Sequence, residues 1–280
     1  MSNVDPVTLK KDIQEHYDLV TPYYNSLWGK HIHHGYWISG KETKEVAQVN
    51  LVKKLIEVGE IKPNRDVLDV GCGVGASSIY LAEHLGERVT GIIISPIQVD
   101  IAKKFAADSN VKVKFLVMDA EKMMFSEKFD YVWSIEAISH FPNKDKFFKD
   151  AILFLNPGGR IALVDWFKKE GLSSQEDKRY IDPIRKGMLV PDISTMQRYE
   201  EILIKNGCKV ITRGDISVET AKTWDISLDI IKNPKFWDLA IKHGRQFVDF
   251  LKSFQAMRAG FSSKSFIYGY IIAEKATLDV

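Results

Sequence analysis

The chain has 280 residues, of which 45% are hydrophobic, and its formal net charge at pH 7 is only +2. A chain of this length and composition can bury a large core. Its basic and acidic residues are interspersed, which argues against nucleic acid as the main partner, because phosphate neutralisation needs a concentrated basic face.

The cysteines and the hydropathy pattern indicate where the protein works. Cys72 and Cys208 lack the spacing of a zinc site, and two lone thiols suit a reducing compartment. Residues 1–11 are polar and lack the apolar core of a signal peptide. No stretch approaches the roughly 18 apolar residues of a membrane span. We therefore expect a soluble, cytoplasmic protein without an integral membrane segment, and the sequence leaves its oligomeric state open.

The N-terminal 60 residues are predicted to form a helical lid. Thr21 precedes Pro22, and this pair predicts that the first helix stops near Val20. Residues 44–58 are predicted to form an amphipathic helix. Several aromatic residues lie in or between these helices: Tyr17, Tyr23, Tyr24, Trp28, Tyr36 and Trp37.

Residues 61–280 are predicted to form the core of the protein. Strands are expected at 67–70, 88–94, 111–117, 131–135 and 160–164, with helices between several of them. Such alternation predicts a parallel sheet covered by helices on both faces. Further strands at 209–213 and 265–274 extend this sheet. The predicted fold is therefore α/β, with a Rossmann-like, doubly wound, mostly parallel sheet and an antiparallel edge strand.

Two segments interrupt the alternation and are predicted to form helical cap insertions, at 167–193 and 218–262. We expect them over the carboxyl ends of the strands, where ligands of open α/β sheets bind. The second segment is rich in large apolar residues, which suits either an apolar acceptor or ordinary cap packing. Arg179, Arg185 and Lys186 in the first could hold an anionic head group such as a diphosphate, or form a solvated face.

A glycine-rich turn follows the first core strand, in Val-Leu-Asp-Val-Gly-Cys-Gly-Val-Gly at residues 67–75. Gly71, Gly73 and Gly75 allow a backbone to pass close under a nucleoside and turn into a helix. Asp69 would repel a pyrophosphate, but it suits a ligand with a cationic amine, such as S-adenosylmethionine (SAM). A dinucleotide site and a ligand-free turn are the alternatives, because Gly71, Gly73 and Ala76 also match the loose dinucleotide pattern.

Further motifs carry a resemblance to a known family. They are Met118-Asp-Ala-Glu121, Phe129-Asp-Tyr-Val-Trp-Ser134 and Leu155-Asn-Pro-Gly-Gly159, in that order after the glycine turn. With them, the chain resembles class I SAM-dependent methyltransferases over most of its length. His31-Ile-His-His-Gly-Tyr-Trp37 looks like the tocopherol C-methyltransferase group, which is related to sterol and cyclopropane-type methyltransferases.

The resemblance implies how SAM is bound. Asp119 would receive the adenine amino group, and the backbone of Ala120 would contact the ring; a helix N-cap is the alternative role for Asp119. The second strand ends without the acid that many class I enzymes use for the ribose. Ile93, Ser95 and Gln98 stand there instead, and Ser95 could equally cap the helix that begins at Pro96.

The resemblance also implies a flap over the cofactor and an acceptor side. Residues 31–37 would close over SAM, with His33 and Tyr17 on the cofactor side. Tyr24, Tyr36 and Trp37 would turn aromatic faces toward developing positive charge near the acceptor. For Tyr23 and Trp28 we favour plain packing. The three histidines at 31–34 have no carboxylate or cysteine partner in the sequence, so we predict no metal site.

Glu136 and His140 follow the fourth core strand. His140 stands where a general base or an acceptor-orienting residue would lie, although Ser139 replaces the acid that precedes it in the family, and a structural histidine is the alternative. Glu136 is expected on the cofactor side.

We therefore predict a SAM-dependent methyltransferase that acts on a small lipophilic molecule, by C-methylation of an isoprenoid-like acceptor, which could be a prenyl diphosphate. One alternative is N- or O-methylation of an alkaloid or phenolic natural product. Alternatives from other classes are an NAD(P)-dependent oxidoreductase and a non-catalytic SAM-binding module.

Overall fold

The computed structural model describes residues 5–234, 237, 241 and 244–277. Its strands are β1 (Asp66–Val70), β2 (Arg88–Ile93), β3 (Lys114–Val117), β4 (Phe129–Ile135), β5 (Leu155–Lys168), β6 (Cys208–Asp215) and β7 (Phe266–Lys275). Its α-helices are α1 (Pro6–Leu27), α2 (Lys44–Gly59), α3 (Ala76–Leu85), α4 (Pro96–Asp108), α5 (Lys144–Leu153), α6 (Ser174–Glu176), α7 (Asp182–Gly187), α8 (Met196–Lys205), α9 (Ser217–Thr220), α10 (Lys222–Ile230) and α12 (Arg245–Ser262). Short helical turns are η1 (Ala120–Lys122), η2 (Ile138–His140) and η3 (Asp177–Ile181).

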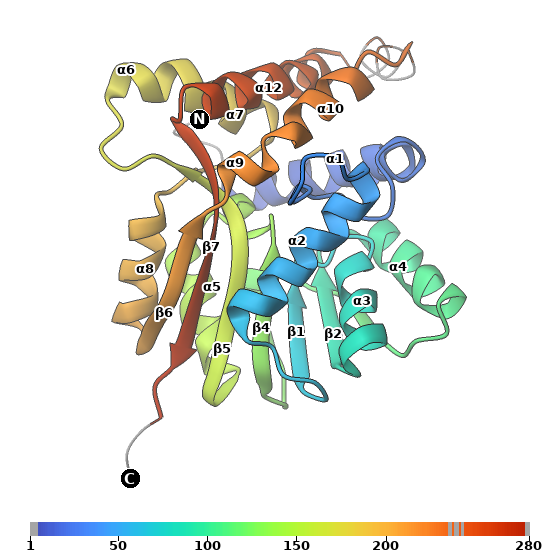
Figure 1. Ribbon diagram of the computed structural model, residues 1–280, viewed down its shortest axis with the longest axis vertical. Helices are drawn as coiled ribbons and strands as arrows, with labels where there is room; N and C mark the ends of the chain where they lie inside the picture. The colour runs from blue at the N-terminus through green and yellow to red at the C-terminus, as the bar shows by residue number, and fades with distance from the viewer. Residues whose placement is uncertain (1–4, 235–236, 238–240, 242–243, 278–280) are drawn as a thin grey trace.

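The seven strands form one sheet in the order β3-β2-β1-β4-β5-β7-β6 (Figure 1). The pairs from β3 to β5 are parallel, and β7 pairs antiparallel with both β5 and β6. The predicted Rossmann-like fold is confirmed. The antiparallel strand β7 lies one place in from the edge, with β6 outside it. The strand order reverses at β1 and β4, so their carboxyl ends flank the crevice where open α/β sheets bind ligands.

Side-chain alternation along the strands builds a core on each face of the sheet. Val67 of β1 packs with Leu51 and Leu55 of α2 on one face. Its neighbour Leu68 packs on the other face, in a cluster with Phe147 of α5 and Leu203 of α8. Figure 1 shows α2 and α3 across the front of the sheet and α8 on the opposite face. Of the predicted lid, α2 therefore covers the sheet, whereas α1 and residues 31–34 lie at the crevice.

The first helix is longer than the sequence predicts. It continues past Pro22 to Leu27, so the expected stop near Val20 was wrong. Proline inside a helix removes one hydrogen bond and destabilises it by about 3 kcal/mol. Packing outweighs this local preference, because Leu9, Ile13 and Val20 are all buried against the rest of the molecule.

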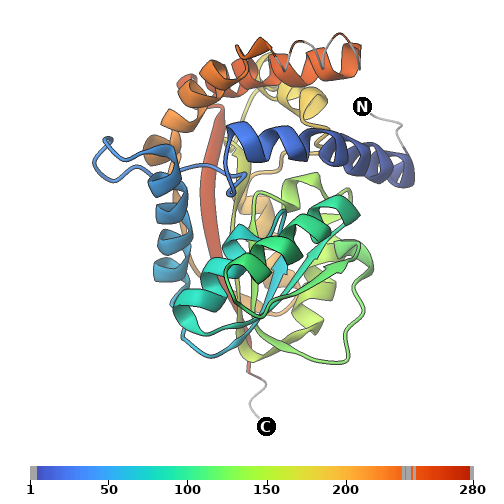
Figure 2. The same ribbon diagram turned by 90° about the vertical axis from the view of Figure 1, so that its right-hand side faces the viewer.

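The described residues place α1 between the sheet and a cap made of α6, α7, α9, α10 and α12. Both views show α1 lying across the top of the sheet with α10 and α12 above it (Figures 1 and 2). The cap corresponds to the two segments predicted to interrupt the alternation. None of the described helices is both long enough and apolar enough to pass through a membrane.

Candidate functional site

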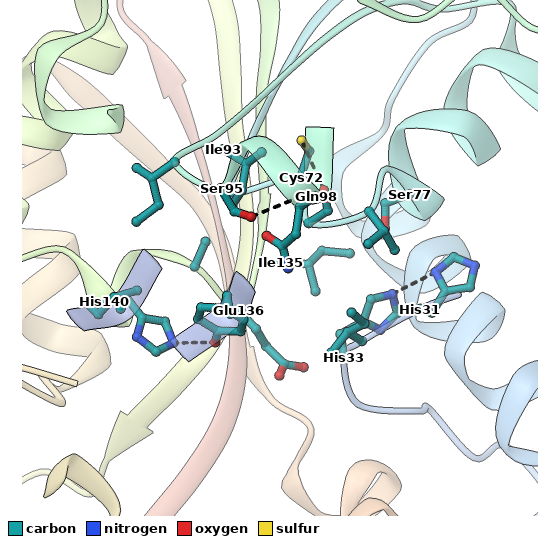
Figure 3. Close-up of a pocket in the computed structure, with 18 of the residues that line it drawn as sticks. His31, His33, Cys72, Ser77, Ile93, Ser95, Gln98, Ile135, Glu136 and His140 are labelled. Carbon is teal, nitrogen blue, oxygen red and sulfur yellow. Dashed lines mark hydrogen bonds between the residues drawn. The ribbon is translucent and has the colours of Figure 1, made fainter. Parts of the chain in front are cut away.

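A large cavity opens at the carboxyl ends of β1, β2 and β4, under α1 and the cap. Its space, including the open mouth, amounts to about 1630 Å³. Figure 3 shows Ser95 and Gln98 on one side of it, with Glu136 and His140 on another and His31 beside His33.

Asp69, at the carboxyl-terminal part of β1, is a buried acid that faces the cavity. Its side chain is 2% exposed, and its Oδ2 accepts a hydrogen bond of 2.6 Å from the Ser78 hydroxyl. No described cationic group pairs with it, and burial raises the pKa of Asp69 to about 7, although the hydrogen bond from Ser78 opposes this shift. A buried carboxylate without a cation is costly. The site therefore fits a ligand that brings its own ammonium group.

The three glycines of the turn are needed for different structural reasons. A Cβ on Gly71 would lie 2.2 Å from Cβ of Ala137, and a Cβ on Gly75 would lie 2.5 Å from the Phe115 ring. A Cβ on Gly73 would meet no atom within 4 Å, and Gly73 lines the cavity. Gly75 does not line it. Gly71 and Gly75 thus allow close packing, while Gly73 leaves space open for a ligand.

Asp119 and Ala120 follow the carboxyl end of β3. Asp119 caps η1, and its Oδ1 accepts a hydrogen bond of 2.9 Å from the N–H of Glu121. Both Asp119 and Ala120 line the cavity. The N-cap role and a ligand role can therefore hold together, and a carboxylate here can accept from an exocyclic amine.

The end of β2 brings Ile93, Ser95 and Gln98 to the cavity wall. Ser95 caps α4, accepting from the N–H of Gln98 at 3.1 Å, and its hydroxyl donates to Asp18 of α1. The Gln98 amide donates to the Thr21 hydroxyl at 3.1 Å. The alternative role of Ser95 as a helix cap is confirmed. Among the described residues, no carboxylate stands at the end of β2, where many class I enzymes have the acid that binds the ribose.

The histidine segment, residues 31–37, lies against the cavity and is tied to the core. His33 Nδ1 donates to the carbonyl of His34 at 2.8 Å, so its Nε2 accepts from His31 Nδ1 at 3.0 Å. Burial lowers the pKa of His31 to about 3, and it also lowers that of His33. The amide of buried Gln48 donates to the carbonyl of His31 at 2.5 Å. Among the described residues, no cluster of His, Cys, Asp or Glu is suited to hold a metal ion.

Glu136 follows β4 in a left-handed conformation with φ of 54°. Its Oε1 accepts three hydrogen bonds: from the N–H of His34 at 2.6 Å, from His34 Nδ1 at 2.8 Å and from the Tyr268 hydroxyl at 2.6 Å. Burial alone would raise the pKa of Glu136, but the contacts with His34, His33 and Tyr268 lower it. Within the described part of the chain no hydrogen bond falls on Oε2. Glu136 is thus an ionised carboxylate with one oxygen left for a ligand.

His140 lies at the junction of the cofactor side and the cap. Its Nε2 is 3.1 Å from the Tyr17 hydroxyl of α1, so the two predicted site residues are in direct contact. Burial lowers the pKa of His140 to about 4, and the charge of Lys144 adds to this shift. Burial likewise lowers the pKa of His16, in the same wall, to about 4. The His140 imidazole is therefore neutral at physiological pH and a weaker base than a free histidine.

Two predicted aromatic residues lie away from the cavity. Trp37 is buried, and its indole N–H donates to the carbonyl of Glu42 at 3.1 Å. Tyr36 packs against the core beside α2. Neither lines the cavity, and the N–H of Tyr36 donates to the carbonyl of Ala47 in α2 at 2.7 Å. The side chain of Tyr24 lies outside the described part of α1.

Other aromatic residues occupy the acceptor side instead. Trp166 at the end of β5 lines the cavity with three side chains of the cap: Trp224, Phe250 and Phe254. His34 contacts this group, with its ring centroid 4.6 Å from that of Trp224. Trp166 could have been found from sequence, because it lies at the carboxyl end of a predicted parallel strand.

Comparison with known proteins identifies relatives of the whole chain. Residues 67–159 match the model of a methyltransferase domain family. Tocopherol O-methyltransferase of Arabidopsis thaliana is 29% identical over 288 residues, covering 95% of this chain and 82% of that protein. The 2-methyl-6-phytyl-1,4-hydroquinone methyltransferase of Synechocystis is 33% identical over 239 residues, covering 79% of this chain and 72% of that protein.

A solved structure shares the fold over almost its whole length. The mycolic acid cyclopropane synthase CmaA1, complexed with S-adenosylhomocysteine (SAH) and CTAB, superposes with a TM-score of 0.84 at 21% identity. The match covers 95% of this chain and 98% of that one.

Proposed function

Because the chain belongs to the class I SAM-dependent methyltransferases and is similar to those named for tocopherol and for 2-methyl-6-phytyl-1,4-hydroquinone, we propose that it methylates an uncharged, isoprenoid-like acceptor on carbon. Membership of this family removes the NAD(P)-dependent oxidoreductase as an alternative. When bound, SAM supplies an electrophilic methyl group. We assign its amine to Asp69 and its adenine to Asp119 and Ala120, while the open space at Gly73 lies between them.

The aromatic lining of the acceptor side carries this proposal. Trp166, Trp224 and Phe250 enclose the part of the cavity under the cap. Adding a methyl group to an alkene or an electron-rich ring carbon leaves positive charge on the acceptor. Aromatic faces stabilise such a cation by about 0.5–2 kcal/mol each, more as water is excluded. These residues take the role that the sequence suggested for Tyr36 and Trp37.

The positions of the cationic residues favour an uncharged acceptor over a prenyl diphosphate. Arg185 pairs with Asp177 at 2.8 Å and with Asp182, and Lys186 pairs with Asp249 at 3.1 Å. Neither residue lines the cavity, and Arg179 lies over the ring of Tyr180 outside it. The cations that line the cavity, within the described residues, are Lys10 and Lys30, both on the cofactor side. Among the described residues, a diphosphate would find no lysine or arginine under the cap.

Two groups can take the proton that a methylated carbon centre releases. Glu136 presents Oε2 to the cavity from a carboxylate whose Oε1 is held by three donors. His140 is neutral and lies beside the Tyr17 hydroxyl. Either group can act as a general base. The neutral imidazole also supports a second candidate, O-methylation of a phenolic hydroxyl, in which it would take the hydroxyl proton.

The proposal is tested by supplying methyl-labelled SAM with prenylated hydroquinones, sterols, prenyl diphosphates, phenols and alkaloid amines. We expect label on a carbon atom of an uncharged prenylated or sterol-like acceptor. Mass spectrometry and NMR of the product locate the methyl group. Label found only on oxygen or nitrogen would contradict C-methylation. A preference for the diphosphates would contradict the uncharged acceptor.

A further inference from the structure

Lys10 of α1 joins the N-terminal helix to the cofactor side of the cavity. Its Nζ lies 2.8 and 2.7 Å from the two carboxylate oxygens of Asp119 and 2.5 Å from Oε2 of Glu121. Lys10 itself lines the cavity. An ammonium group thus lies between two carboxylates, one of which we assign to adenine.

We propose that Lys10 is a positioning residue of the adenine subsite, which fixes the Asp119 carboxylate so that one oxygen can accept a hydrogen bond from the 6-amino group of the cofactor. The inference rests on the proposed assignment of Asp119 to adenine. Oδ1 of Asp119 already accepts from Lys10 and from the N–H of Glu121. Among the described residues, Oδ2 accepts only from Lys10, which leaves it a lone pair for the ligand.

Charge explains why a lysine is needed at this place. The carboxylates of Asp119 and Glu121 share one cation, and like charges this close repel each other when the cation is removed. The carboxylate of Asp119 would then turn away from that of Glu121, which is held by the N–H of Asn143 at 2.6 Å. Lys10 therefore fixes the orientation of the Asp119 carboxylate and also balances its charge.

The position of Lys10 does not depend on its own flexible side chain alone. Farther along α1, Asp18 accepts from the Ser95 hydroxyl, and the Thr21 hydroxyl accepts from the Gln98 amide at 3.1 Å. Ser95 and Gln98 belong to the wall of the same cavity. The helix that carries Lys10 is thus held against the cavity wall at two further points, which keeps Lys10 beside Asp119.

The test compares two ligands that differ only at the 6-position. One is SAH, and the other is its purine analogue with hydrogen in place of the 6-amino group, which keeps the ring acceptors. Calorimetry gives the Kd of each for the wild type, Lys10→Met and Lys10→Arg. We expect Lys10→Met to weaken SAH about tenfold, the loss of about one hydrogen bond, with little change for the analogue. Lys10→Arg should keep most of the preference for SAH.

Lys11→Met is the matched control, because Lys11 is exposed and its ion pair is with Glu15. It should leave the preference for SAH unchanged. Equal weakening of both ligands in Lys10→Met would overturn the proposal, since Lys10 would then only anchor α1. Asp119→Asn separates the two assignments. If it keeps the full preference for SAH, the adenine assignment of Asp119 is wrong; if it loses the preference while Lys10→Met retains it, only the role of Lys10 is wrong.

Discussion

Replacing Gly73 with leucine is expected to weaken the binding of SAH at least a hundredfold while the protein still folds. A Cβ on Gly73 would meet no atom of the protein within 4 Å, and Gly73 lines the cavity in which we place the cofactor. A hundredfold loss corresponds to about 2.7 kcal/mol of binding free energy. The left-handed φ of 54° adds a folding penalty of about 1–2 kcal/mol for a residue other than glycine. Calorimetry with SAH and thermal unfolding measure the two effects separately.

Gly171→Leu is the control for the backbone penalty. Gly171 is exposed, has φ of 67°, and likewise has no atom near its missing Cβ, but it lies outside the cavity. The control should lose comparable stability and keep wild-type affinity. Wild-type affinity in Gly73→Leu would show that the cofactor does not pass this glycine. Gly71 is less suitable for this test, because a Cβ there collides with Ala137 and would disturb the turn itself.

The second large effect is a pH dependence of cofactor binding that comes from Asp69. Its carboxyl group has a pKa of about 7 because it is buried without a cation. The ligand's ammonium group binds the ionised form, so binding must release a proton below pH 7. The affinity for SAH should therefore fall by about tenfold for each pH unit below 7. Asp69→Asn should weaken binding at pH 8 and remove this slope.

The same shift has a consequence for the protein without ligand. A carboxyl group whose folded pKa lies above its unfolded value stabilises the fold at low pH. Its contribution is complete below about pH 4 and is lost as the pH rises to about 7.

Glu87→Gln is the control for the pH dependence of SAH binding. Burial also raises the pKa of Glu87 to about 7, but this residue lies away from the cavity. An unchanged slope in Asp69→Asn would assign the titration to another group.

Residues that lie next to a strong local pattern could be predicted from the sequence. The glycine turn after β1 requires the backbone that glycine permits, so Asp69 and Gly73 are fixed relative to the strand that precedes them. Ser95 lies before Pro96 at a helix start, and Asp119 follows a parallel strand. In each case a short stretch of sequence determines the local geometry, and the sheet then brings these ends together at one edge.

Residues whose position depends on packing between distant segments could not be predicted. The aromatic residues Tyr36 and Trp37 were expected to face the acceptor, yet neither lines the cavity. The local sequence does not indicate that Oε1 of Glu136, far away in the chain, accepts hydrogen bonds from His34. Trp224 reaches the cavity only because α10 folds back over the sheet.

The contacts of the histidine segment also change which part of the predicted lid is expected to move. The N–H of Gly35 donates to Thr223 at 3.1 Å, and that of Trp37 donates to the carbonyl of Glu219 at 2.9 Å. Residues 31–37 are thus bonded to α2, to the end of β4 and to the cap. We therefore expect α1, rather than this segment, to move when the cavity opens.

The most direct test of the whole account is a crystal structure of the protein with SAH. The account predicts the amine of SAH within hydrogen-bond distance of Asp69 and the backbone of Gly73 against the ligand. It also predicts the 6-amino group at Asp119, with Lys10 still beside that carboxylate. The thioether sulfur should face Glu136 and the aromatic group around Trp166. SAH bound in the reverse direction, or outside this cavity, would contradict the account.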